Sequence, residues 1–460
     1  KVTKRSLIMS AYMNYIDSGI QWVGKVPSSW QRSRIKYLLT RSSAGVWGED
    51  EKGDQNDVVC IRIADFNYQQ GNLCLDNLTI RNIDSKQLAG RVLSEGDLII
   101  EKSGGGDVSP VGRVVRYSGT GLKRATYSNF SHAISVNQEK CNPEFLYYYF
   151  FALYANKINL QFFNQTTGIQ NLSVSDYLSQ SIFLPNLSEQ AAIVKYLNRK
   201  CSEISNVIET QEKIINYLKE LQHNIITEAT IHGVYGKREM TQSKVNWIGY
   251  YPANWEFKKF NYVCSLITDF VASGSFADLR ENVHYLTEPD YAMLVRTVDL
   301  SEKGKEDSKV YISKESYDFL RNSNLYGGEV ILPNVGSVGS VYMMPDNLYP
   351  HMSLAPNAIM FRTKYNNKFY YYFFKGFVGN KILTDLAQAT TLAKFNKTDL
   401  RAVKVFVPPI EEQNTIVAYL DEKCEPIDKA IDNVQHQIDT LKEYKQSLIT
   451  EVITGKRKVI

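Results

Sequence analysis

The stretch PNLSEQAAIVKYLNRKC at residues 185–201 returns as PPIEEQNTIVAYLDEKC at residues 408–424, at an offset of 223 residues. Self-similarity at a fixed interval is the sequence signature of a duplicated structural unit. A second motif repeats at a similar offset, in which Trp22-Val23-Gly24, Pro27 and Trp30 match Trp247-Ile248-Gly249, Pro252 and Trp255. The chain of 460 residues therefore consists of two related halves that share a frame of matched motifs.

A long run of helical periodicity begins within the repeated stretch of each half. Apolar residues follow one another at alternating spacings of four and three, which is the seam of a coiled coil. Residues 204–229 of the first run would form a helix about 40 Å long at about 1.5 Å per residue. The seam residues, which are also candidates for docking a partner, are Leu197, Ile204, Ile208, Ile215, Leu218, Ile225, Leu420, Ile427, Ile431, Ile438, Leu441 and Leu448.

The two runs predict long helices over residues 189–235 and 411–460. Because a long apolar seam needs a partner, we expect the helices to pair with each other, antiparallel if the duplication produced pseudo-twofold symmetry. The alternative is that each helix packs on its own globular domain. Ser202 and Pro426 predict a break near the start of each run, where a new helix would begin with a Ser cap or an N-terminal Pro.

Between the matched motifs lie two diverged regions, residues 31–180 and 256–405. They differ in sequence but share the same pattern of short apolar runs and turns. Short apolar or alternating runs are separated by Gly, Asn and Asp turns, as is typical of β-strands. The clearest runs are residues 58–63, 97–100, 111–117, 132–136, 292–298, 330–332, 340–343 and 358–361. Tyrosine-rich residues 147–151 match residues 370–374 and predict helices with one buried aromatic face. The predicted fold class is α+β, with two mixed α/β domains joined by two long antiparallel coiled-coil helices in an internal tandem repeat.

Polar loops in the diverged regions carry the candidate ligand-contacting residues. A glycine-rich turn at residues 102–107 corresponds to residues 334–340. Glycine lets a ligand approach the backbone closely, although a turn that only needs positive φ explains it equally well. A second loop pair, residues 165–171 and 388–394, is rich in amide and hydroxyl groups that can read adenine edges or hold phosphates. The candidates are Lys102, Ser103, Arg113, Gln165, Thr167, Gln170, Asn171, Asn334, Ser337, Thr390, Thr391 and Lys394.

The composition, with 43% hydrophobic and 22% charged residues, is ordinary for a soluble globular protein. A net charge of +4 is too small for a general basic coat, so any binding of nucleic acid must come from local clusters. A basic tail follows each long helix, at Lys237-Arg238 and Lys456-Arg457, which suits the helix dipole and equally suits phosphate. The longest apolar run, residues 145–155, is far short of the roughly 20 residues of a membrane helix, and no secretion signal is evident. We therefore expect a cytoplasmic protein that does not enter a membrane.

The motifs of common enzyme classes are absent from the sequence. It contains no Walker A loop, H-E-x-x-H or G-x-S-x-G motif, no glycine-rich S-adenosylmethionine loop, and no C-x-x-C pair for a metal. His132 and Asn357 align between the halves, and strand-edge hydrogen bonds explain them better than catalysis. A binding protein that holds no metal is favoured over an enzyme.

The order of the matched motifs, present twice, resembles the specificity subunits of type I restriction-modification enzymes. The resemblance covers nearly the whole chain, although residues 1–12 match nothing. It rests on residues 17–24 with Pro27 and Trp30, on residues 408–413 through Tyr419-Leu420, and on residues 441–444, 447–451 and 455–456.

The resemblance implies two target-recognition domains, residues 13–188 and 236–410, each of which reads one half of an asymmetric bipartite sequence in double-stranded DNA. Conserved helices at residues 189–235 and 411–460 would set the spacer between the halves and dock two methyltransferase subunits. Those subunits would methylate adenine with S-adenosylmethionine, and restriction subunits would use ATP and Mg²⁺. The resemblance implies no cofactor in this chain.

Two other interpretations stay open at the level of sequence. One is a single-chain DNA methyltransferase or nuclease with unrecognised motifs, which a methyl-transfer assay on the isolated chain would reveal. The other is a coiled-coil scaffold that never touches DNA, which failure to protect any duplex in a footprint would favour.

Overall fold

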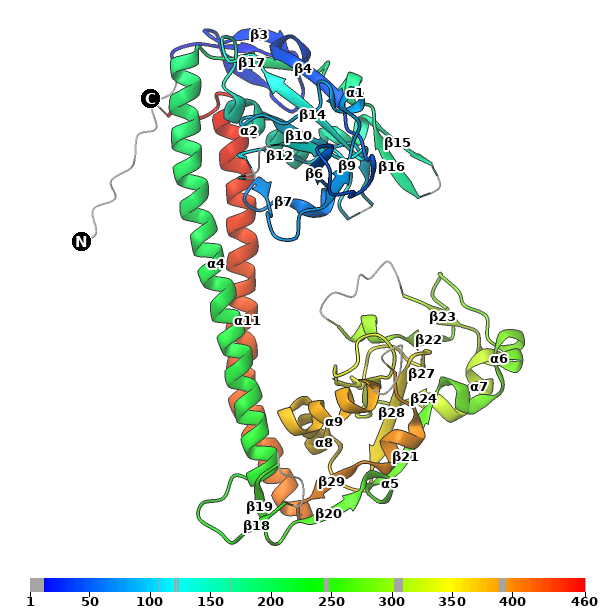
Figure 1. Cartoon of the computed structure of the whole chain (residues 1–460). Helices are drawn as coiled ribbons and strands as arrows, with labels where there is room; N and C mark the ends of the chain where they lie inside the picture. Colours follow the sequence, from blue (N-terminus) through cyan, green and yellow to red (C-terminus); the bar gives the residue numbers. More distant parts are fainter. Residues whose placement is uncertain are drawn as a thin grey trace, which may run out of the picture. The chain divides into compact units, whose positions relative to one another are not determined.

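The computed structural model describes residues 12–106, 108–119, 121, 124–166, 168–243, 248–301, 309–388 and 394–459 (Figure 1). The chain divides into two compact units. Unit 1 comprises Lys1–Glu212 with His436–Ile460, and unit 2 comprises Lys213–Gln435. Each unit therefore contains one diverged region together with a part of both long helices.

Two four-stranded sheets form the globular part of unit 1. The first is antiparallel and has the order β12 (Val114–Arg116), β10 (Leu98–Glu101), β14 (Ser131–Val136) and β4 (Leu39–Ala44). The second has the order β13 (Ala125–Tyr127), β6 (Asp57–Ile61), β9 (Ile80–Asn82) and β5 (Glu49–Asp50), with β13 parallel to β6. The four strands predicted for this region are confirmed as β6, β10, β12 and β14.

The first three residues of strand β10 are apolar because both faces of the strand are covered. Leu98 and Ile100 belong to the cluster that contains the helices of unit 1, whereas Ile99 packs with Val59 and Ile61 of the second sheet. A strand that is buried on both faces shows no polar alternation. The two sheets of unit 1 therefore enclose a core of their own, beside the helical core.

Shorter elements complete unit 1. Its remaining strands are β1 (Tyr15–Asp17), β2 (Lys25–Pro27), β3 (Gln31–Arg34), β7 (Phe66–Asn67), β8 (Asn72–Leu73), β11 (Ser103–Gly104), β15 (Phe163–Thr166), β16 (Ile169–Leu172) and β17 (Ser181–Leu184). Its short helices are α1 (Ser85–Leu88), α2 (Pro143–Ala155), α3 (Val174–Tyr177) and the 3-10 turns η1 (Ile35–Leu38), η2 (Ile63–Asp65) and η3 (Ile158–Gln161).

Unit 2 repeats this architecture with two four-stranded sheets. One has the order β21 (Cys264–Asp269), β28 (Ala358–Thr363), β25 (Val330–Pro333) and β26 (Tyr342–Met343). The other has the order β23 (Tyr311–Ile312), β22 (Ala292–Val295), β27 (Met352–Leu354) and β24 (Asn324–Leu325), with β22 parallel to β27. The predicted strands of this region are confirmed as β22, β25, β26 and β28.

The remaining elements of unit 2 surround these sheets. The strands are β18 (Met240–Gln242), β19 (Tyr250–Pro252), β20 (Glu256–Lys259) and β29 (Lys404–Val407). The helices are α5 (Phe260–Val263), α6 (Phe276–Asn282), α7 (Lys314–Phe319), α8 (Asn367–Lys375), α9 (Phe377–Gln388), α10 (Lys397–Ala402) and the turns η4 (Phe270–Ser273), η5 (Thr297–Leu300) and η7 (Arg321–Ser323).

The tyrosine-rich segments form helices α2 and α8, as predicted, but in a different register. Asn142 and Asn366 are the N-caps of these helices, which sets their offset at 224 and not 223. The hydroxyl of Tyr148 accordingly donates to Asn198 at 2.7 Å, as that of Tyr372 donates to Asp421 at 2.7 Å. Helix α2 is also buried on more than one face, since eight of its side chains from Phe145 to Leu153 are inaccessible.

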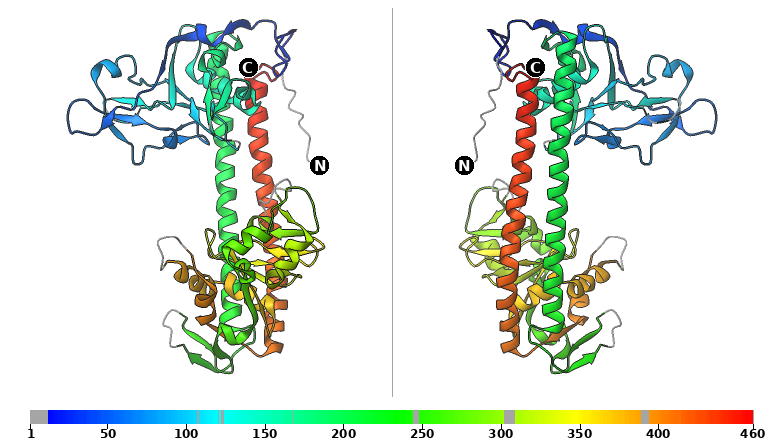
Figure 2. Two further views of the ribbon diagram at one scale, coloured as in Figure 1. Left: turned by 90° about the vertical axis from the view of Figure 1, so that its right-hand side faces the viewer. Right: turned by 90° about the vertical axis from the view of Figure 1, so that its left-hand side faces the viewer.

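The long helices are α4 (Leu187–His232) and α11 (Ile410–Ile453), and they run antiparallel within each unit (Figures 1 and 2). In unit 1, Lys445 Nζ donates to Ser205 Oγ at 2.9 Å. In unit 2, Gln222 Nε2 donates to Asp428 Oδ1 at 2.7 Å. The two contacts are the same contact with the helices exchanged, because adding the offset of 223 to 205 and 222 gives 428 and 445.

The predicted breaks at Ser202 and Pro426 are wrong, because both helices continue through these positions. Proline in a helix interior removes one backbone hydrogen bond and costs about 3 kcal/mol. Before the proline, Leu420 and Cys424 are buried in the core of unit 2, and after it Asp428 accepts a hydrogen bond from Gln222 of α4, so contacts on both sides hold the helix across Pro426. Tertiary packing therefore outweighs the local preference.

Tryptophans of the repeated entry motif anchor the start of each long helix. Trp30 Nε1 donates to Glu189 Oε1 at 3.2 Å, and Trp255 Nε1 donates to Glu412 Oε2 at 2.9 Å. Arg238, in the basic tail after α4, pairs with the buried Glu412 and donates to the carbonyl of His232. Arg238 thus caps the C-terminus of α4, as the helix-dipole interpretation of the basic tails expects. None of the helices in the described ranges is both long and apolar enough to cross a membrane.

Candidate functional site

The two polar loops predicted in the first half come together in unit 1 as a three-stranded sheet, β11-β16-β15. Ser103 pairs with Asn171, and Gly104 pairs with Gln170. The Ser103 hydroxyl donates to Asn171 Oδ1 at 2.7 Å. Two loops whose paired residues Ser103 and Asn171 are 68 positions apart in the chain therefore form one polar surface, on which the Asn171 side chain is exposed.

Gln170 has a structural part in this sheet. Its side chain is 2% exposed, and its Oε1 accepts the backbone N–H of Val111 at 3.2 Å. Gly105 lies against the same atoms with φ of 59°, so a side chain at that position would meet the Val111 nitrogen. Glycine at position 105 lets the backbone pack closely against Val111 and Gln170 of the same chain. This packing supports the interpretation of residues 102–107 as a turn.

Arg113 is held by an ion pair within the fold. Its guanidinium donates two hydrogen bonds to the Glu101 carboxylate, at 2.7 and 2.9 Å, and lies 3.8 Å from the centre of the Tyr68 ring. Glu101 is 1% exposed and needs this partner, because an unpaired buried charge is strongly destabilising. Arg113 therefore neutralises the Glu101 carboxylate at the end of β10, a role that the sequence did not indicate.

Lys102 lies near His132 on the neighbouring strand. Burial, together with the positive charge of Lys102, lowers the pKa of His132 to about 4. The Nε2 atom of His132 is 2.8 Å from Ser42 Oγ on strand β4. This bond between neighbouring strands agrees with the predicted role of His132. The predicted match of His132 to Asn357 is wrong. When β14 and β28 are aligned through their pairing with β10 and β25, His132 matches Ile359 and Phe130 matches Asn357.

The corresponding loops of unit 2 make the same backbone contact. The N–H of Phe395 donates to the carbonyl of Asn334 at 3.2 Å, as that of Leu172 donates to Lys102 at 2.8 Å in unit 1. An isolated bridge joins Val335 to Lys394, as Ser103 pairs with Asn171 in unit 1.

The side chains at these matched positions differ between the units. Lys394 is exposed at the position of Asn171. Asn334 Nδ2 donates to the carbonyl of Phe395 at 3.0 Å. Ser337 is exposed, and its carbonyl accepts the N–H of Ser340. The two units thus share the backbone contacts of these loops but expose different side chains at matched positions.

Four of the predicted positions receive no side-chain description. Thr167, Thr390 and Thr391 lie outside the described residues. Gln165 lies in β15, where its backbone pairs with Gln170. The assignment of these four residues to a contact surface stays a prediction.

An arginine-aspartate pair repeats in both units and was missed by the sequence analysis. Arg62 Nη2 bonds Asp65 Oδ1 at 2.9 Å after strand β6, and Arg296 Nη2 bonds Asp299 Oδ1 at 2.7 Å after strand β22. The Asp side chains are 4% and 2% exposed, and the Arg side chains are 38% and 30% exposed. The signal was an R-x-x-D motif at the end of an apolar run in each half.

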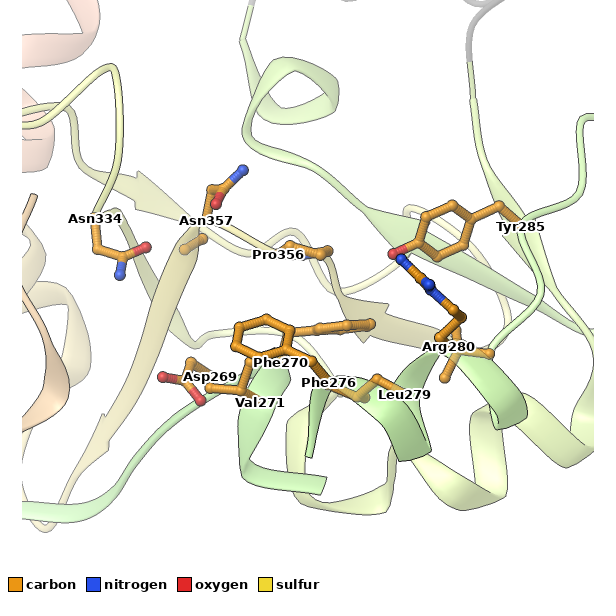
Figure 3. Close-up of a pocket in the computed structure, with 12 residues that line it drawn as sticks. Asp269, Phe270, Val271, Phe276, Leu279, Arg280, Tyr285, Asn334, Pro356 and Asn357 are labelled. Atoms are coloured by element: carbon orange, nitrogen blue, oxygen red, sulfur yellow. The ribbon is translucent and has the colours of Figure 1, made fainter. Parts of the chain in front are cut away.

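Each unit has a pocket beside its candidate loop. The pocket of unit 1 measures about 390 Å³ and is lined by Arg62, Ser103 and Phe130, among others. The pocket of unit 2 measures about 550 Å³ and is lined by Asn334 and Asn357, among others (Figure 3). No group of three or more His, Cys, Asp or Glu residues suited to a metal ion occurs in the part of the chain that the structure describes.

The seam positions are buried or half-buried, as their periodicity predicts. Those that join the core of unit 1 are Leu197, Ile204, Ile208, Leu441 and Leu448, and those that join the core of unit 2 are Ile225 and Leu420. Ile215 and Ile438 are buried, and Leu218, Ile427 and Ile431 are half-buried. Polar pairs such as Gln211 with Gln437, 2.9 Å apart, interrupt the apolar seam.

Comparison with known proteins agrees with this architecture. The chain is 21% identical, over 95% of its length and 96% of the relative, to a Methanocaldococcus jannaschii protein assigned as the type I restriction enzyme MjaX specificity subunit. The MjaVIII specificity subunit of the same organism is 22% identical over 68% of this chain and 70% of its own. A solved structure from work on complex assembly and conformational transition of the type I R-M system has the same fold, with a TM-score of 0.62 at 16% identity, and covers 93% of this chain and 98% of that one.

Both halves match one protein family. The family described as "Type I restriction modification DNA specificity domain" matches residues 27–220 and again residues 252–443. These two matches cover most of the chain and follow the duplication that the sequence and the two units display. This protein therefore belongs to the family of type I restriction-modification DNA specificity subunits.

Proposed function

We propose that the chain reads an asymmetric bipartite DNA sequence, with one target-recognition domain for each half, and that it has no catalytic machinery of its own. The observation that carries the proposal is the pair of polar loops on a common frame. The carbonyls of Lys102 and Asn334 make the same backbone contact, but Asn171 in one unit is replaced by Lys394 in the other. A matched frame with unmatched polar groups is what two different DNA half-sites require.

Domain assignments follow the predicted boundaries. We assign residues 13–188 and 236–410 to the recognition domains, and residues 189–235 and 411–460 to the conserved helices. The helices set the spacer between the half-sites, because helix length increases by about 1.5 Å per residue.

An exposed apolar stripe on α4 supports the docking of a partner on the helices. Within unit 2, Ile214, Tyr217 and Leu221 are 41%, 69% and 49% exposed, although all are large and apolar or aromatic. Residues at spacings of three and four lie on one face of a helix. An exposed apolar face of this kind marks an interaction surface, and we assign it to a methyltransferase subunit.

The proposed assembly supplies the chemistry that this chain lacks. Two methyltransferase subunits would bring S-adenosylmethionine and methylate adenine, and restriction subunits would bring ATP and Mg²⁺. We place the assembly in the cytoplasm, where bacterial and archaeal DNA is accessible to it.

The test is a methylation selection with the intact assembly. The chain is produced together with a methyltransferase partner, incubated with S-adenosylmethionine and a library of randomised duplexes, and the methylated duplexes are sequenced. We expect one bipartite motif with a fixed spacer. Methyl transfer by the isolated chain would support the single-chain methyltransferase instead, and failure of the assembly to protect any duplex in a footprint would support the scaffold.

A further inference from the structure

The pockets of the two units occupy the same place in the fold. The N–H of Lys102 donates to the carbonyl of Phe130 at 2.9 Å, and the N–H of Asn334 donates to the carbonyl of Asn357 at 3.1 Å. Phe130 directly precedes β14 and Asn357 directly precedes β28, and each of them lines its pocket. One wall of the two pockets is therefore built from equivalent residues.

A second wall is equivalent as well. Strands β4 and β21 pair with β14 and β28 in the same antiparallel arrangement. The segment after β4 contributes Trp47 to the pocket of unit 1, and the segment after β21 contributes Phe270 and Val271 to that of unit 2. Equivalent strands therefore form a cavity at the same position in both units, although the sequences of the two domains have diverged.

The linings of these cavities differ in chemistry. Apart from Arg62, whose counterpart Arg296 recurs in unit 2, unit 1 presents Trp47, Ser103, Asn129 and Phe130. Unit 2 presents Phe276, Arg280, Tyr285, Asn334 and Asn357, with the rings of Phe270 and Phe276 between the asparagine amides and the Arg280–Tyr285 pair (Figure 3). Phe276 and Arg280 stand one turn apart on α6, so both project from the same helix face.

Aromatic side chains in these pockets are unusually accessible. Phe276 is 83% exposed and Tyr285 is 58% exposed in unit 2, while Phe130 is 45% and Trp47 is 37% exposed in unit 1. The Arg81 guanidinium already lies over the Trp47 ring, 4.5 Å from its centre. The exposed surfaces of the other rings are apolar areas that a ligand can cover. Aromatic faces, amides and guanidinium groups are the groups with which proteins contact nucleobases.

Two asparagines in the pocket of unit 2 add observations of their own. The Oδ1 atom of Asn334 is buried and has no hydrogen-bond partner among the residues that the structure describes. Asn357 adopts φ of 69°, a left-handed conformation that asparagine tolerates better than most residues other than glycine. The unsatisfied acceptor of Asn334 points to a bound partner that donates a hydrogen bond at this pocket.

We propose that these two equivalent pockets are the base-reading sites, and that the side chains lining each pocket decide which half-site its domain accepts. This inference rests on the proposed function and deepens it. The matched walls hold each domain in the same pose on DNA, and the unmatched side chains contact base edges. Each pocket therefore controls its own half of the target and leaves the other half unchanged.

The experiment applies the methylation selection to variants of both pockets in the intact assembly. Phe276→Ala and Arg280→Ala alter unit 2, and Asn129→Ala and Trp47→Ala alter unit 1. We expect each variant to lower the preference at one or two positions of a single half-site by about fivefold or more, since one good base contact discriminates by about that factor. Unit 1 and unit 2 variants should relax opposite halves of the motif.

Matched controls remove exposed tyrosines outside the pockets. Tyr37→Ala in unit 1 and Tyr262→Ala in unit 2 delete rings that are 59% and 64% exposed, and both should leave the motif unchanged. Phe276 and Asn129 are exposed, so their truncation leaves the core intact, which a melting curve verifies. If the unaltered assembly selects no bipartite motif, the proposed function fails and this assignment falls with it. If it selects one and the pocket variants retain it, or relax both halves equally, only the pocket assignment is overturned.

Discussion

Arg62 in unit 1 and Arg296 in unit 2 make the same interaction. Each binds a buried aspartate that follows a buried strand. The turn after β6 is already closed by the Arg62 N–H, which donates to Asp65 Oδ2 at 2.7 Å. The guanidinium is therefore not needed to form the turn. Arg62 is held by Asp65, is still 38% exposed and lines the pocket, so we predict that its guanidinium pairs with a DNA phosphate.

We predict that Arg62→Gln weakens DNA binding about equally for all target sequences. The loss of one phosphate contact should lower the slope of log affinity against log salt by about 1. Titration of the assembly with labelled duplex at several salt concentrations measures that slope. Arg34→Gln, an arginine on the exposed strand β3, serves as control. A slope that stays unchanged in Arg62→Gln would assign the pair a purely structural role.

His132 makes the stability of unit 1 depend on pH. Its pKa is lowered from 6.5 to about 4, chiefly by burial, so the folded protein holds it neutral where the unfolded chain would protonate it. The unfolded state then binds more protons, and the free energy of unfolding rises as pH rises from about 4 to about 6.5. The gain is at most about 3 kcal/mol. Urea titrations across this range should show a flatter dependence in His132→Asn, and an equally steep one would contradict the assignment.

At the scale of elements, Pro426 lies inside a continuous helix that its chemistry disfavours. It cannot donate a hydrogen bond to the carbonyl of Glu422, one turn earlier. Pro426→Ala restores that bond and should raise the free energy of unfolding by up to about 3 kcal/mol. Asn433→Ala, at an exposed position of the same helix, should change it by less than about 1 kcal/mol. Equal effects of the two substitutions in a denaturant titration would show that the helix is bent or broken at Pro426.

Tyr217 lies at the centre of the exposed stripe on α4. A charge placed there should prevent an apolar partner from docking, since burial of an unpaired carboxylate is costly. We expect Tyr217→Glu to reduce co-purification of the methyltransferase subunit at least tenfold while the melting temperature stays the same. Asn216→Glu adds the same charge at an exposed neighbouring position and should retain the partner. Full recovery of the partner with Tyr217→Glu would move the docking surface elsewhere.

For the whole molecule, the paired helices are proposed to define the spacer of the DNA target. Deletion of one heptad from both α4 and α11 keeps the seam in phase, because seven residues span two turns of a coiled coil. We expect the selected motif to keep both half-sites and to shorten its spacer, or binding to be lost. Replacing seven exposed helix residues without deletion should leave the spacer as it was. The same spacer after the deletion would refute the role of the helices in spacing.

Much of the architecture was predictable because repeats and periodicity are properties of the chain itself. Motifs at offsets of 223 and 225 showed the duplication, and spacings of four and three located the helix seam from Leu197 onward. Apolar runs such as residues 97–100 became strands, because a run of this kind must be buried on both faces. The polar loops were also well located, since Ser103 and Asn171 do meet in one sheet.

The tertiary structure decided what depends on neighbours in space. Arg113 is bound by Glu101, and Arg62 by Asp65, because a buried carboxylate requires a nearby positive charge, and only the fold determines which carboxylates are buried. The helix persists through Pro426 because packing on both sides outweighs the loss of one hydrogen bond. The sequence thus determined the frame through patterns along the chain. The side chains that this frame brings together at each pocket follow from three-dimensional register and burial, which those patterns do not encode.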